Sequence, residues 1–133
     1  MEKKGLLLVG HGSSLPYNKE LAETVAAMIR EACPEYIVKC GFMRINQPTI
    51  PESLEAFRHE PIDLLVVVPL FLADGIHVAK DIPSRIGLPE GEKRLSFEIN
   101  GRSIPLVYAD PIGAEPLLAD LMVRNARKVL AQN

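Results

Sequence analysis

The chain has 133 residues, of which 47% are hydrophobic and 24% charged, and its formal net charge is −2 at pH 7. This size and composition are typical of a soluble globular protein with one domain, which we expect to span residues 1–133. The slightly acidic balance argues against a nucleic-acid-binding protein, because such proteins usually carry a basic excess.

The lengths of the apolar stretches and the spacing of the cysteines predict the cellular compartment of the protein. The longest apolar stretch, residues 64–73, is too short to cross a membrane, and no signal-peptide pattern follows the N-terminal lysines. Cys33 and Cys40 lack the spacing of a zinc or redox motif, so we expect two reduced, buried thiols. We therefore expect a cytoplasmic protein with no membrane partner.

The first half of the chain alternates between strand and helix patterns. Residues 5–9 form a continuous apolar run, which is typical of a strand covered on both faces. Residues 18–32 carry apolar side chains at intervals of three and four, which predicts a helix. Residues 36–42 predict a second strand, and Pro48 and Pro51 suit the start of a second helix.

The second half continues this alternation. Residues 62–72 are the most hydrophobic segment and predict a central parallel strand. Residues 78–86 predict a short helix, and residues 113–131 predict a longer one with apolar residues at helical intervals. Between these helices, Asn100-Gly101 predicts a tight hairpin turn within residues 95–110.

Strands that alternate with helices predict an α/β fold with three layers. We expect a mostly parallel, four-stranded sheet with helices on both faces and the flavodoxin-like strand order 2-1-3-4. In such sheets ligands bind beyond the carboxyl ends of the strands, where the winding direction reverses. Here that point falls between the first and third strands.

Two of the three histidines are predicted to meet at this point. His11 follows the first strand between two glycines, and His77 lies in the loop that leaves the third strand. Imidazoles are common ligands of transition metals and accept protons near neutral pH. His59 ends a helix near the opposite edge and is expected to be a surface residue. A structural turn residue remains an alternative for His11, but two histidines at one crevice favour an open metal site from which the ion can be passed on.

The serines after His11 allow two interpretations. Gly12, Ser13 and Ser14 lead into the first helix, where backbone N–H groups and hydroxyls suit an anion such as phosphate or carboxylate. N-capping of the helix is the alternative. The stretch does not match a dinucleotide fingerprint, a P-loop or a nucleophile elbow.

Three motifs together resemble one enzyme family. "VGHGSSLPYNKE", "GFMRINQPTIPESL" and "VPLFLADGIHVAKDIP" follow the first three predicted strands. They resemble the short, archaeal-type class II tetrapyrrole chelatases, the CbiX-small group of sirohydrochlorin cobalt chelatases and the related sirohydrochlorin nickel chelatases of methanogens. The likeness covers nearly the whole chain, and residues 69–83 are its most specific part.

The resemblance implies an activity and a site. The expected enzyme is a lyase that inserts Co²⁺ or Ni²⁺ into sirohydrochlorin without ATP or an organic cofactor, in cobalamin or methanogen nickel-tetrapyrrole biosynthesis. His11 and His77 match the two metal-facing histidines of the family, whose short members are homodimers. Longer relatives often carry a glutamate after the second strand, whereas here the nearest carboxylate is that of Glu52.

The macrocycle carries eight carboxylates, so its site needs hydrogen-bond donors and cations beside an apolar wall. The expected substrate-binding residues are Gly12, Ser13, Ser14, Arg44, Leu72, Gly75, Ile76 and Lys80. For Lys80 and for Arg85, a solvated helix face is an equal alternative. A carrier that holds the metal or the ring without chemistry is the alternative function. A flavodoxin-like FMN or anion binder is less favoured, because the chain has no Trp and only three Tyr.

Overall fold

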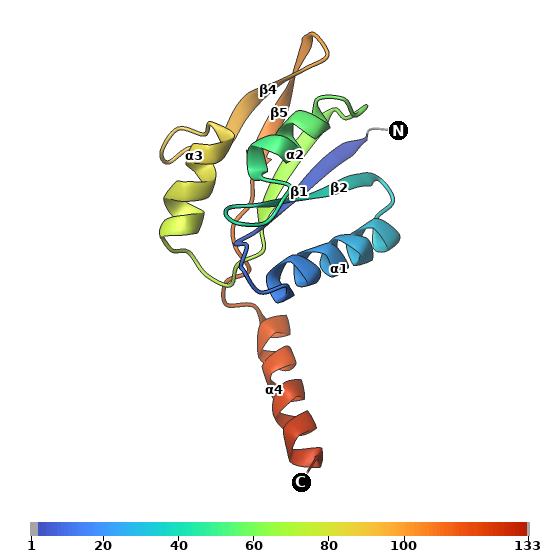
Figure 1. Ribbon diagram of the computed structural model, residues 1–133, viewed down its shortest axis with the longest axis vertical. Helices are drawn as coiled ribbons and strands as arrows, with labels where there is room; N and C mark the ends of the chain where they lie inside the picture. The colour runs from blue at the N-terminus through green and yellow to red at the C-terminus, as the bar shows by residue number, and fades with distance from the viewer. Residues whose placement is uncertain (1–2, 133) are drawn as a thin grey trace.

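The structure is a computed structural model that describes residues 3–132 (Figure 1). In chain order the elements are β1 (Lys4–Gly10), α1 (Tyr17–Ala32), β2 (Tyr36–Phe42), α2 (Ile50–Phe57), β3 (Leu64–Pro69), η1 (His77–Asp81), α3 (Ile82–Ile86), β4 (Arg94–Ile99), β5 (Arg102–Tyr108) and α4 (Pro116–Ala131). The predicted α/β alternation is confirmed. No helix in the described range combines the length and hydrophobicity needed to cross a membrane.

The sheet has five strands rather than the four expected. Its order is β2-β1-β3-β5-β4, so the predicted 2-1-3 core is correct and the winding direction reverses between β1 and β3. The predicted hairpin supplies both remaining strands. β5 pairs in parallel with β3, and β4, which precedes β5 in the chain, pairs antiparallel with the other edge of β5. Asn100 and Gly101 form the turn with φ of 48° and 78°, as a type I′ turn requires.

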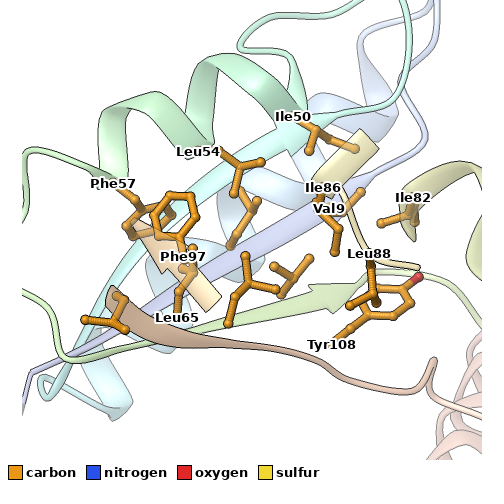
Figure 2. Packing of buried hydrophobic residues seen from close by; sticks show 14 of the residues in the cluster. Val9, Ile50, Leu54, Phe57, Leu65, Ile82, Ile86, Leu88, Phe97 and Tyr108 are labelled. Carbon is orange, nitrogen blue, oxygen red and sulfur yellow. The ribbon is translucent and has the colours of Figure 1, made fainter. Parts of the chain in front are cut away.

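Helices cover the two faces of the sheet unequally. Side chains alternate along β1 and β3, so that Leu7, Val9, Leu65 and Val67 face the α2 and α3 layer while Leu6 and Leu8 face α1. Figure 2 shows the larger of the two cores, where Ile50, Leu54 and Phe57 of α2 meet Leu65 and Phe97 of the sheet. Each such side chain contributes about 1.5–3 kcal/mol when fully buried.

Two of the predicted segments whose bounds differ from the structure lie next to the histidines. β3 ends at Pro69 instead of residue 72, and the following helix begins at His77 with a π-helical turn instead of at residue 78. His77 is therefore the first residue of a helix and not a loop residue. Strand β5 stabilises this turn, because the Tyr108 hydroxyl donates a hydrogen bond of 2.8 Å to the Val78 carbonyl.

The last helix covers neither face of the sheet. The helix expected over residues 113–131 forms from Pro116 to Ala131, but none of its residues is buried. Figure 1 shows α4 projecting away from the body of the fold after the link that leaves β5. The helix layers of this chain thus consist of α1 on one face and of α2 and α3 on the other.

Candidate metal site

The two histidines predicted to share the carboxyl edge lie against each other. The ring centroids of His11, after β1, and His77, at the start of η1, are 4.8 Å apart with an interplanar angle of 60°. Phe71, in the loop that leaves β3, packs its ring edge-on to His11 at 6.3 Å. His59 has its side chain 77% exposed beside Glu55, in keeping with the surface role expected for it.

Both imidazoles use the same ring nitrogen to contact the protein. Nδ1 of His77 is 2.7 Å from Oδ2 of Asp81, and Nδ1 of His11 is 3.0 Å from the Gly12 carbonyl oxygen. A carbonyl or carboxylate oxygen only accepts, so these contacts assign the proton of each neutral ring to Nδ1. The lone pair then lies on Nε2 of both rings, which is the form that binds a metal ion.

In the part of the chain that the structure describes, the two histidines have no third protein ligand beside them. Within residues 3–132 no group of three His, Cys, Asp or Glu side chains is placed to hold a metal ion. Glu52 is used elsewhere, since its carboxylate accepts the Thr49 N–H at 2.8 Å in the capping box of α2. That hydrogen bond also lowers the pKa of the Glu52 carboxyl. An ion on the histidine pair would keep its other coordination positions open for exchange.

A tight contact between two loops fixes the position of His11. Gly12 has φ +85°, and a Cβ atom built there would lie 1.9 Å from the Arg44 carbonyl oxygen, so only glycine fits. The Gly12 N–H donates to Oδ1 of Asn18 at 2.9 Å, and the Ser13 N–H donates to Oδ1 of Asn46 at 2.8 Å. The loop after β1 is thus fastened to the loop after β2.

These contacts change the interpretation of the serines. The N–H groups of Gly12 and Ser13, expected to face an anion, already bind asparagine side chains. Ser13 accepts the Leu15 N–H through Oγ at 3.1 Å, and the N-cap position of α1 is Pro16, which makes no side-chain cap. Neither serine therefore caps the helix, and Ser14 is left exposed for a ligand.

A hollow of about 340 Å³ lies beside His11. Its lining residues are His11, Gly12, Ser13, Ser14, Asn18, Arg44 and Ile45. Two larger hollows, of about 420 and 380 Å³, contain neither histidine. We place the site at the smaller one because it joins the imidazole to an exposed arginine. Its volume is near the lower end of the range for ligand pockets, so a macrocycle would extend beyond it.

Some of the remaining candidate residues lie beside the histidines, and others lie outside the site. Leu72, Gly75 and Ile76 are exposed on the loop between β3 and His77. Lys80 is exposed but lines the hollow beside α3 and not the one beside His11. The guanidinium of Arg85 donates to the Met43 carbonyl, which gives it a structural role rather than a substrate contact.

Exposed apolar side chains surround the histidines at this edge. Leu15, Ile45, Leu72, Ile76 and Ile112 follow four different strands and are between 42% and 65% exposed. Ile45 is the most unusual of these residues, since it has φ +65° in a turn where the Asn46 N–H donates to the Arg44 carbonyl at 2.7 Å. A β-branched residue rarely adopts this conformation, so the fold holds an isoleucine outward here against its backbone preference.

Sequence reasoning missed three residues that shape the site. Asp81 carried a usable signal, because it lies four residues after His77 in a segment predicted to be helical. Asn18 and Asn46 carried none, since their contacts with the loop after β1 depend on how separate loops meet.

Known proteins are similar to this chain in sequence and in fold. A family model described as CbiX matches residues 5–129. Two proteins named sirohydrochlorin cobaltochelatase, from Methanosarcina barkeri and Methanococcoides burtonii, are 41% and 40% identical over 129 residues, which is 97% of this chain and 98% of each relative.

Solved structures agree with the fold. A CbiX protein from Marinobacter aquaeolei VT8 superposes with a TM-score of 0.71 at 25% identity, over 98% of this chain and 99% of that one. The sirohydrochlorin chelatase SirB from Bacillus subtilis subspecies spizizenii, solved in complex with cobalt, gives a TM-score of 0.77 at 23% identity. That match covers 96% of this chain but 51% of SirB. From the family match and the near full-length relatives, this chain belongs to the CbiX family.

Proposed function

We propose that this protein is a sirohydrochlorin chelatase that inserts Co²⁺ into the macrocycle. The observation that carries the proposal is the contacting pair His11 and His77, whose Nε2 lone pairs are both available at an open, apolar edge. The relatives named sirohydrochlorin cobaltochelatase support both the substrate and the metal. We propose the reaction as a lyase activity without ATP or an organic cofactor.

The reaction exchanges one divalent cation for two protons. The metal ion sheds water, binds the four ring nitrogens, and displaces the protons of two pyrrole N–H groups. Neutral imidazoles suit this exchange, because they bind a borderline metal through nitrogen and can also accept a proton. Two such ligands hold the ion less firmly than a closed site would, so it can move on to the ring.

The substrate contacts follow from the same edge. We assign Arg44 and Ser14 to the carboxylates of the macrocycle, and Leu72 and Ile76 to its apolar plane, with Gly75 leaving room between them. Lys80 faces a different hollow, so its proposed contact is with an outer carboxylate. Gly12 and Ser13 also line the hollow beside His11, but their N–H groups donate to asparagine side chains, so the donor that we assign to the substrate here is the Ser13 hydroxyl.

Three finer points belong to the same proposal. Ni²⁺ remains an alternative metal, which would place the protein in nickel-tetrapyrrole rather than cobalamin biosynthesis. We propose a cytoplasmic homodimer, since a single edge offers few walls for a ligand as wide as a tetrapyrrole. A non-catalytic carrier of metal or ring is the alternative function, because it would use the same two histidines.

Histidine variants test the proposed site. His11→Ala and His77→Ala should each lower the rate of Co²⁺ insertion at least about tenfold, since second-shell changes alone often cost that much. His59→Ala is the matched control, because this histidine is exposed and lies outside the site. Insertion is followed by the visible spectrum under anaerobic conditions, and circular dichroism checks the fold. Near-normal rates in both site variants would remove the histidines from the mechanism.

A further inference from the structure

The loop after β1 fixes the side-chain amide of Asn18 in one orientation. Asn18 is the second residue of α1, and its Oδ1 accepts the Gly12 N–H at 2.9 Å. A backbone N–H only donates, so the amide oxygen faces Gly12 and the Nδ2 amino group is turned away from it. Gly10 leaves room for this side chain, since a Cβ atom built at Gly10 would lie 2.9 Å from the same oxygen. The fold therefore sets the direction in which Asn18 can donate.

The Nδ2 group of Asn18 is a donor that the protein does not use. Among residues 3–132, Gly12 is the one hydrogen-bond partner of this side chain. No buried side-chain nitrogen or oxygen in the same range lacks a partner, so an unpartnered Nδ2 must be accessible at the surface. Asn18 lines the hollow beside His11. Its amide is thus available to a ligand in that hollow.

Other donors and one positive charge surround this amide. Ser13 and Ser14 contribute hydroxyls to the hollow, and Arg44 contributes its guanidinium. In the described part of the chain, no aspartate or glutamate is among the lining residues. A carboxylate matches such a set, because a guanidinium and neutral N–H and O–H groups all donate to its two oxygens. The chemistry of the hollow therefore favours an anionic group.

The size of the hollow decides which part of the substrate enters it. Its volume of about 340 Å³ is too small for a whole tetrapyrrole but sufficient for one carboxylate-bearing side chain of the ring. His11 lines the same hollow, and the ring centroids of His11 and His77 are 4.8 Å apart. A macrocycle that places one carboxylate in the hollow would thus lie beside the histidine pair.

We propose that Asn18 is a substrate-binding residue, whose Nδ2 donates to one carboxylate of the macrocycle next to the guanidinium of Arg44. The inference rests on the proposed function and gives Asn18 a second role besides its loop contact. Because the Gly12 N–H already holds the amide in place, little conformational entropy is lost when the carboxylate binds. The contact is made by the bound substrate as well as by the transition state, so it lowers KM and leaves kcat nearly unchanged.

An isosteric variant separates the two roles of Asn18. Asn18→Asp keeps an acceptor for the Gly12 N–H but replaces the donor with a negatively charged oxygen. It should raise the Kd for metal-free sirohydrochlorin at least about tenfold, because a hydrogen bond to a charged group is lost and a like charge is added. Titration followed by the visible spectrum measures this Kd, and the insertion assay should show the increase in KM with little change in kcat.

Asn46→Asp is the matched comparison. The Oδ1 atom of Asn46 accepts the Ser13 N–H at 2.8 Å between the same two loops, but Asn46 does not line the hollow. This variant makes the same change of charge, and it should alter the Kd for sirohydrochlorin much less than Asn18→Asp does. An equal effect of the two variants would reject the proposal, because it would reflect charge or loop geometry in general.

Titration with Co²⁺ alone distinguishes a lost substrate contact from a displaced loop. Asn18→Asp should bind Co²⁺ at least as tightly as the wild type, because His11 stays in place and a carboxylate is added beside it. Weaker binding of both Co²⁺ and sirohydrochlorin would reduce Asn18 to its loop contact and overturn the proposal. An unchanged Kd for sirohydrochlorin would overturn the proposal alone, whereas a wild type that does not bind sirohydrochlorin would overturn the proposed function with it.

Discussion

At the scale of single residues, the site depends on how each imidazole is held. The Asp81 carboxylate accepts from Nδ1 of His77 at 2.7 Å, and both side chains are about two-fifths exposed. A carboxylate behind a ligating histidine fixes the ring's orientation and increases its basicity toward the metal. We therefore propose that Asp81 acts through His77, as a positioning residue rather than a catalytic one.

Replacing Asp81 should weaken metal binding without unfolding the protein. Asp81→Asn keeps an acceptor oxygen and should raise the Kd for Co²⁺ about tenfold, and Asp81→Ala should raise it up to about 100-fold. The free energy of unfolding should change by at most about 1 kcal/mol, because the pair is partly exposed. Isothermal titration with Co²⁺ alone measures the first effect, with Asp74→Asn, in the loop before η1, as the control. An unchanged Kd in Asp81→Ala would contradict this role.

At the scale of elements, a contact from β5 stabilises the π-helical turn η1, whose first residue is His77. The Tyr108 ring is buried in the larger core, and its hydroxyl donates to the Val78 carbonyl at 2.8 Å. Burial of this group, assisted by the negative charges of Asp74 and Asp110, raises the pKa of Tyr108 to about 12. The neutral phenol is the form that the folded state needs, since only it can donate this hydrogen bond.

This contact predicts a pH-dependent difference in stability. The folded pKa of Tyr108 lies above its unfolded value of about 10, so its contribution is present below pH 10 and is lost as the pH rises toward 12. Tyr108→Phe leaves the Val78 carbonyl without its donor and should cost about 1–3 kcal/mol at pH 8. Urea unfolding at pH 8 and pH 11 should show this gap narrowing at the higher pH. Tyr17→Phe, which is exposed, serves as the control, and a gap independent of pH would contradict the assignment.

Periodicity and topology predict most elements and the meeting of the histidines. His11 and His77 follow neighbouring parallel strands, whose carboxyl ends must share one edge. The fifth strand was miscounted because a hairpin signal does not say which arm joins the sheet. Sequence reasoning missed the exposed position of α4, because periodic apolar residues predict that a helix packs against a surface and do not say which surface. The contact of Gly12 with the Arg44 carbonyl depends on two loops meeting in space, which no local pattern encodes.

At the scale of the whole molecule, the fold places the two histidines of the proposed metal site at an open edge, which would surround only part of a macrocycle. The two histidines lie beside a hollow of about 340 Å³, with exposed apolar residues around them. Such an edge can receive a flat ring from outside, and a second copy would add the opposing wall. This arrangement suits transfer of the ion better than its storage, because no third protein ligand within residues 3–132 closes the site.

Turnover of the substrate tests the central claim most directly. A catalytic amount of the protein is mixed anaerobically with excess sirohydrochlorin and Co²⁺, with a parallel reaction in Ni²⁺, and the visible spectrum is compared with a reaction lacking protein. The account predicts conversion well beyond one equivalent per subunit, faster than the protein-free reaction and faster with Co²⁺ than with Ni²⁺. Conversion that stops at one equivalent, or a rate equal to that without protein, would contradict a chelatase, and the first of these results would identify a carrier.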